Sequence, residues 1–527
     1  MRFGSGVLAI VNANVHTMNP ARPKAEAVLI KGDRIALVGD NHQILAACPS
    51  GANKLDLGGR TLLPGLIDTH VHLMETGLGQ LTPSLEGCRC IGDVLRAISS
   101  NGPLPGVIPA FGLDPTRLRE QRYPTRRELD SVAPDSVVYI ARRDLHSASL
   151  NSKALSCLSL PRGVVGLELD EDGQPTGVLR AEAWELAADT LTSLIDRPTW
   201  TRALDKAVSS ALKAGLTTVH ALVDEDAGNG CHIEIVLAFQ RAAEAEPTRP
   251  SLRIVPYLQT VEVDKAVNLG LRHVGGCLLV DGSLGSQTAA LSQPYFDRPN
   301  WQGVLYFDDA ELFDFIRRAH RAGLQVAMHA IGDRAIEQLL DAYERVLSRY
   351  PRCDHRHRIE HFLLPTAEQV ERAAKLGLCV AVQPAFQYLW GGRGGLYWQR
   401  LGAERYERFA AHRTIMQAGI CIAGGSDSPV TPMDPLLGIH AAVNSPNERE
   451  RLGPLDAARL YTANAAWLGF EESFKGTIEA GKLADLVVLD DDPLGADVGS
   501  LRDIAVDMTV VGGQVLYSRW SERPASN

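Results

Sequence analysis

Hydrophobic residues in the middle of the chain occur in short runs that alternate with amphipathic stretches. The runs include GLTTVHALV, QVAMHAIGD, HRIEHFLL and ICIAGGSD, and the stretches at 309–323 and 336–350 repeat hydrophobic positions every three or four residues. Strand-like runs that alternate with helix-like stretches are typical of βαβ units and a parallel sheet. About eight such runs favour an α/β fold with a closed, TIM-like (β/α)8 barrel.

The two ends of the chain have a different pattern, with short strand-like runs separated by Gly, Asn, Asp and Pro. We predict that residues 1–62 and 470–527 form one small composite β-sandwich, and that residues 63–469 form the barrel. Residues 75–200 interrupt the barrel rhythm with Pro- and Gly-rich stretches. This break predicts a lid-like insertion after the first barrel strand.

Composition limits the classes of function. The chain has 527 residues, 45% hydrophobic and 22% charged, as expected of a folded globular protein with more than one structural unit. Its formal net charge is −10 and it has no basic run, which argues against nucleic acid as a partner. It has neither a signal-peptide pattern nor an apolar stretch of about 20 residues, so we predict no membrane span and a cytoplasmic location. Nine scattered cysteines fit reduced thiols better than a disulfide framework.

The candidate chemistry begins in the segment LLPGLIDTHVHLMETG, where an apolar run ends in His70 and His72. Alternate residues of a strand face the same side, and two imidazoles on one face suit a divalent metal such as zinc. A single HxH pair is weak evidence in a chain with 15 histidines. The second pair, His355 and His357, lies in the charged segment DHRHR, which we interpret as a solvated loop.

Three further candidate ligands end separate predicted strands: His329, His361 and Asp427. Any one of them alone could be structural. Barrel enzymes, however, assemble their active sites at the carboxyl ends of the strands. These three residues and the His70–His72 pair occupy four such strand ends, and together they predict a metal site.

This ordered set resembles the amidohydrolase superfamily, in particular its amidohydrolase 3, YtcJ-like branch. The resemblance covers nearly the whole chain and includes GLIDTHVHLMETG, VDGSLGSQTAAL, HAIGDRAI, RIEHF, GGSDSPV, YTANAAWLGF and GTIEAGKLADLVVLD. It implies a metal-binding barrel with a small β-sandwich formed from both chain ends. It also implies that His70, His72 and Asp427 hold one metal and that His329 and His361 hold a second, and it gives a homodimer as the expected assembly.

The chain departs from many of these relatives at one position. They carry a lysine, modified to a bridging carbamate, four residues before the Asp-Gly of DGSLGS, whereas this chain has Cys277. A thiolate is a good zinc ligand, and some relatives of the D-aminoacylase type use a cysteine at the metals, so we predict that Cys277 is a ligand. Alternatively, Cys277 is a small apolar strand residue and one Zn²⁺ binds tightly instead of two.

These residues predict hydrolysis of a C–N bond of a small, rather apolar molecule: an N-acyl, N-formyl or cyclic amide. Metal-activated hydroxide would attack the carbonyl, and Asp427 would transfer the proton to the departing nitrogen. We expect His146, His220 and Trp390 to contact the substrate, although His220 could be structural and Trp390 could serve in packing. Alternative functions are a deaminase, a metal-dependent lyase or isomerase, and a catalytically silent interaction protein.

Overall fold

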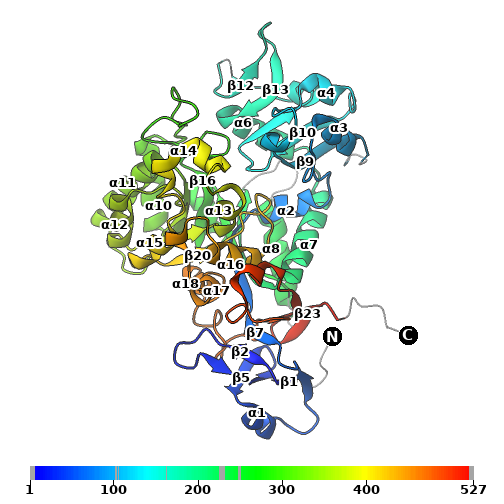
Figure 1. Cartoon of the computed structure of the whole chain (residues 1–527), viewed down its shortest axis with the longest axis vertical. Coiled ribbons are helices and arrows are strands. Elements are labelled where there is room, and N and C mark those ends of the chain that lie inside the picture. Colours follow the sequence, from blue (N-terminus) through cyan, green and yellow to red (C-terminus); the bar gives the residue numbers. More distant parts are fainter. Residues whose placement is uncertain are drawn as a thin grey trace.

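The computed structural model describes residues 6–100, 104, 106–161, 163–224, 232–246 and 251–520. These residues form three parts that follow one another along the long axis of the molecule (Figure 1). A β-sandwich lies at one end, the barrel lies in the middle, and the inserted sheet with its helices lies at the other end.

The central part is a parallel sheet of eight strands that nearly closes into a barrel, as predicted. Its two outer strands meet where Val71 pairs with Ser428, and the His72 amide donates to the Ser428 carbonyl at 3.0 Å. In spatial order the strands are β20 (Ile422–Gly424), β19 (Cys379–Val382), β18 (Arg358–His361), β17 (Gln325–Ala330), β16 (His273–Leu279), β15 (Arg253–Gln259), β14 (Leu216–Asp224) and β8 (Leu66–Val71).

The strands and helices of the barrel follow from the hydrophobic pattern. Strands β8, β17 and β18 are buried along their whole length, as expected of parallel strands covered on both faces. Two of the covering helices are α10 (Asp309–Arg321) and α11 (Asp333–Arg349), which lie where the amphipathic stretches predicted them. Helix α10 begins with a capping box in which Asp308 and Glu311 each accept the other's backbone amide.

Both ends of the chain meet in the sandwich, where β7 (Thr61–Pro64) pairs with β21 (Leu486–Leu489). One sheet has the order β23-β22-β21-β7-β2-β3, and the other has the order β5-β4-β1-β6. The remaining strands are β1 (Val7–Val11), β2 (Asn14–His16), β3 (Lys24–Ala25), β4 (Ala27–Lys31), β5 (Arg34–Gly39), β6 (Asn53–Asp56), β22 (Val506–Val511) and β23 (Gln514–Ser518). The core of the sandwich contains residues from both chain ends, among them Ile10, Leu62, Val488 and Met508. The domain boundaries themselves stay predictions.

The insertion follows the first barrel strand and contains a five-stranded sheet in the order β12-β13-β11-β10-β9. Helix α2 (Leu73–Gly79) leads into it from His72, and α7 (Arg197–Lys213) leads back to the barrel. Gly77 packs directly against the backbone of Ala203, where a Cβ would overlap the carbonyl oxygen. The strands are β9 (Val107–Leu113), β10 (Val137–Arg142), β11 (Ser147–Leu150), β12 (Leu167–Leu169) and β13 (Pro175–Arg180), and α6 (Ala181–Thr192) follows them.

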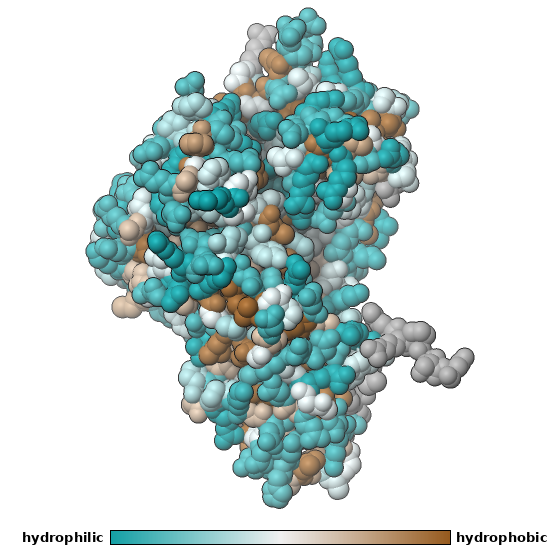
Figure 2. Space-filling view, viewed as in Figure 1, coloured by the Kyte–Doolittle hydropathy of each residue, from teal (hydrophilic) through white to brown (hydrophobic). Residues whose placement is uncertain are grey.

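The face of the molecule in Figure 2 is mainly hydrophilic, with hydrophobic residues gathered over the barrel near the sandwich. Among the described residues, no helix has both the length and the apolar character needed to cross a membrane.

Candidate metal centre

The structure brings all six predicted ligands to the carboxyl ends of the barrel strands. His70 lies in β8 with His72 directly after it, Cys277 lies in β16, His329 in β17 and His361 at the end of β18, and Asp427 follows β20. Their ligand atoms form three overlapping groups, each within 4.8 Å: His70, His72 and Cys277; Cys277, His329 and His361; and His70, His361 and Asp427.

Three buried polar atoms at the centre of this cluster have no hydrogen-bond partner: Nε2 of His70, Nε2 of His361 and Oδ1 of Asp427. His70 Nε2 lies 3.2 Å from Asp427 Oδ1, but the pair lacks hydrogen-bond geometry. Buried polar atoms are costly unless they are satisfied, and two imidazole nitrogens beside a carboxylate are a typical ligand set for a divalent ion. The residues therefore fit the metal that the sequence predicts.

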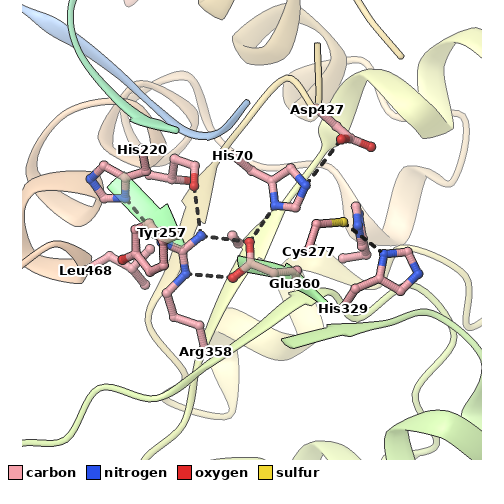
Figure 3. A network of polar contacts seen from close by, with 12 residues as sticks. His70, His220, Tyr257, Cys277, His329, Arg358, Glu360, Asp427 and Leu468 are labelled. Atoms are coloured by element: carbon pink, nitrogen blue, oxygen red, sulfur yellow. Dashed lines mark hydrogen bonds and ion pairs between the residues drawn. The ribbon is translucent and has the colours of Figure 1, made fainter. Parts of the chain in front are cut away.

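Neighbouring side chains orient these ligands. His70 donates through Nδ1 to Glu360 at 2.6 Å (Figure 3). His361 donates through Nδ1 to Gln383 at 2.7 Å, so each ring keeps Nε2 for the centre. Neither Glu360 nor Gln383 stands out in the sequence. The position of Glu360, directly before His361 in the segment RIEHF, was the only signal that could have identified it.

Glu360 also forms a fully buried ion pair with Arg358, whose Nη2 lies 2.7 Å from the Glu360 carboxylate. Arg358 donates in addition to the Thr69 carbonyl at 2.8 Å and lies over the Tyr257 ring. Burial on its own would raise the pKa of Glu360, but the Arg358 charge and the hydrogen bond from His70 lower it below its usual value. A charged carboxylate thus lies behind His70 (Figure 3).

Glu360→Gln should lower both stability and metal affinity. The change leaves Arg358 as a buried charge without its partner, and such a loss costs about 3–5 kcal/mol. It also removes the acceptor of His70 Nδ1, and loss of such an outer partner typically weakens metal binding 10–100-fold. Thermal unfolding with and without metal, and metal titration, measure the two effects. Glu450→Gln, at a buried carboxylate that binds Thr414, is the matched control. Equal metal affinity in the two variants would contradict the orienting role.

Cys277 faces the same centre, with Sγ 3.4 Å from Nδ1 of His329. Burial opposes a thiolate, but the charge of His329, its hydrogen bond and the nearby His361 and His70 imidazoles bring the pKa of Cys277 well below its ordinary value. Cys277 is therefore held as a thiolate, the form that binds zinc.

The centre opens into a cavity of about 540 Å³ between the barrel and the insertion. His146 and Trp390 both line this cavity, as expected of substrate contacts. The His146 ring lies 5.5 Å from that of His329, centroid to centroid, and the Trp390 ring lies 5.6 Å from that of Phe386. Burial lowers the pKa of His146 to about 4, so its ring is neutral at pH 7.

Two other histidine predictions have different outcomes. His220 is fully buried and does not line the cavity; its Nδ1 lies 3.1 Å from the Arg358 guanidinium and its ring stacks on Tyr257. These contacts favour a structural role for His220 over a contact with the substrate. The assignment of His355 and His357 to a solvated loop is wrong, because both side chains are buried. His357 contacts His320 at 2.8 Å and accepts the Val326 amide, which satisfies its two ring nitrogens inside the packing.

Fold and centre together define a metal-dependent hydrolase with a barrel active site. The amidohydrolase family model matches residues 54–517, and the chain belongs to this family. It is 30% identical to YtcJ of Bacillus subtilis (strain 168), a protein named as an amidohydrolase, over 96% of this chain and 98% of that protein. It is also 30% identical to the N-substituted formamide deformylase of Arthrobacter pascens, over 97% of this chain and 98% of that enzyme.

The solved structures agree. An uncharacterized metal-dependent hydrolase from Pyrococcus horikoshii OT3 superimposes with a TM-score of 0.77 at 28% identity, covering 94% of this chain and 99% of that one. A related hydrolase from Pyrococcus furiosus gives 0.74 at 29% identity, covering 93% of this chain and 100% of that one. The chain is thus a metal-dependent amidohydrolase that acts on C–N bonds other than peptide bonds.

Proposed function

We propose that this protein hydrolyses an N-formyl or N-acyl amide of a small molecule with Zn²⁺ as its metal. The observation that carries the proposal is the set of buried, unpartnered atoms on His70, His361 and Asp427, which face one another at the mouth of the barrel. The similarity to an N-substituted formamide deformylase over 97% of the chain supports the choice of bond.

In this proposal His70, His72 and Asp427 would hold one ion and His329 and His361 would hold a second, with Cys277 as a further ligand. A bound divalent ion supplies a nucleophilic water at neutral pH and polarises the carbonyl of the substrate. Burial opposes ionisation of Asp427, but His70 and His72 hold its pKa far below the usual value, so Asp427 is a carboxylate. Asp427 Oδ1 accepts the proton of the attacking water and returns it to the departing nitrogen.

The cavity of about 540 Å³ beside the centre has room for a small substrate. Phe386, Trp390 and Tyr397 form an aromatic wall beside the centre, which suits the apolar part of an amide. His146, neutral and next to His329, is placed to bind a polar atom of the substrate. We further expect a cytoplasmic protein that forms a homodimer. Light scattering of the purified protein would test the dimer.

The substrate class can be tested with metal-loaded protein and matched N-formyl, N-acetyl and cyclic amides. We expect amine release from at least one class, with formyl or acyl products detected by chromatography. Absence of turnover across the panel would contradict the proposal, release of ammonia from amino-substituted rings would favour a deaminase, and a product without solvent oxygen in ¹⁸O-water would indicate a lyase or isomerase.

Metal removal should abolish the activity. After dialysis against dipicolinate we expect kcat to fall more than about 100-fold, because the several kcal/mol supplied by the metal are lost. Zn²⁺ should restore the activity in proportion to the metal bound. Full activity of protein shown by elemental analysis to be free of metal would exclude metal-dependent hydrolysis.

A further inference from the structure

One wall of the cavity is acidic. Glu75 of α2, Glu185 and Asp189 of α6, and Asp224 at the end of β14 all line it. Within the described ranges, none of these four carboxylates forms an ion pair with lysine or arginine. Three of them lie near a histidine or an amide instead: His146 lies 3.9 Å from Glu185, His232 lies 3.8 Å from Glu75, and Gln259 donates to Asp224.

The arginines of the same cavity already have partners. Arg142 pairs with Asp144, and Arg143 lies 2.9 Å from Glu86, donates to the Val430 carbonyl and covers the Trp390 ring. Neither arginine is therefore left to pair with the acidic wall. Burial, followed by the charge of neighbouring carboxylates, raises the pKa of Glu185 to about 8 and that of Glu75 to about 7. A cation at the wall would lower both pKa values and favour the ionised carboxylates.

Buried polar atoms without partners surround the same wall. Both ring nitrogens of His232, the Tyr139 hydroxyl and Nε1 of Trp200 have no hydrogen-bond partner, although the three side chains are almost wholly buried. His232 offers a ring nitrogen within 4.8 Å of carboxylate oxygens of Glu75 and Asp224. Tyr139 and Trp200 line the cavity beside the carboxylates. Carboxylates combined with aromatic rings are typical of sites that bind organic cations.

We propose that the acidic wall binds a positively charged nitrogen of the substrate, so that the substrate is an N-formyl or N-acyl compound with a second, basic amine. This inference rests on the proposed function. His146 joins the two sites, because it lies 3.9 Å from Glu185 and its ring lies 5.5 Å from that of His329. A molecule with its amide at the metal centre thus places its ammonium group only a short chain away. This narrows the expectation of a small, rather apolar molecule to one that also carries a basic amine.

The test compares two formamides of equal length, one ending in a primary amine and one ending in a methyl group. For the unmodified protein we expect kcat/KM to favour the amine by at least about tenfold, as for a charge-assisted hydrogen bond. Two variants should each reduce this preference: the single variant Glu185→Gln, and the double variant that combines Glu75→Gln with Asp224→Asn. Glu182→Gln, at an exposed residue of the same helix outside the cavity, should keep it. An equal preference in all variants would overturn the inference, and continued hydrolysis would leave the proposed function intact.

Calorimetry with a short alkylammonium ion separates this inference from the proposed function. Binding to the unmodified protein that is weakened at least about tenfold by Glu185→Gln supports the acidic wall even if no amide is hydrolysed. Absence of binding overturns it. Elemental analysis provides the rival outcome: an additional divalent ion that Asp224→Asn removes, without any preference for the cationic substrate, would assign Glu75, Asp224 and His232 to a metal instead.

Discussion

Replacing Asp427 by asparagine is expected to lower kcat/KM about 1,000-fold, within the 10²–10⁴-fold range for loss of a general base. Oδ1 of Asp427 lies 3.2 Å from Nε2 of His70 and 3.3 Å from Nε2 of His72. In the proposed mechanism this carboxylate oxygen is both a metal ligand and the proton acceptor. Asparagine keeps the shape of the side chain but cannot take up the proton. The rate is measured at a metal content that elemental analysis shows to be equal to that of the unmodified protein.

Asp434→Asn is the matched control for this change. Asp434 accepts the amides of Leu436 and Leu437 at the start of α16 (Pro435–Val443), and asparagine caps a helix about as well as aspartate. We expect near-normal activity from it. A kcat/KM of Asp427→Asn within about tenfold of the unmodified protein would assign the proton transfer to another group, since a general base contributes at least about 100-fold.

The sequence predicts the barrel and its ligands because they depend on local pattern. Apolar runs that end in His70, His329 and His361 identify strand ends, and strand ends of a barrel lie at one face. Burial of His355 and His357 does not follow from the charged segment around them. It arises from the long-range packing of His357 against His320 and β17, which only the fold brings together.

The acidic wall was beyond prediction for the same reason. Its carboxylates come from α2, α6 and β14, and each one, taken alone in the sequence, is an ordinary surface-type residue. Only the fold brings Glu185 and Asp189 of α6 to the same cavity as Glu75 of α2. The candidate ligands are thus predictable from strand ends, whereas the wall that we propose to select the substrate depends on the insertion.

Cys277→Ala is expected to weaken binding of at least one metal ion by more than about 100-fold, which exceeds the 10–100-fold effect of losing an outer partner of a ligand. Sγ of Cys277 lies within 4.8 Å of ligand atoms of His70 and His72 in one group and of His329 and His361 in another. No other residue of β16 belongs to these groups. We therefore expect elemental analysis to show one ion fewer per chain and kcat to fall with it. Cobalt substitution gives an independent readout, because the sulfur-to-cobalt absorption band should vanish.

Cys379→Ala controls for the loss of a buried thiol. Cys379 is 1% exposed in β19 and belongs to none of the groups of candidate ligands among the described residues, so its replacement should affect packing but leave the metal content unchanged. If Cys277→Ala instead binds the same number of ions with the same affinity as this control, Cys277 is a small apolar strand residue. The histidines and Asp427 would then hold the metal without a bridging thiolate, and the missing lysine of the family would have no replacement.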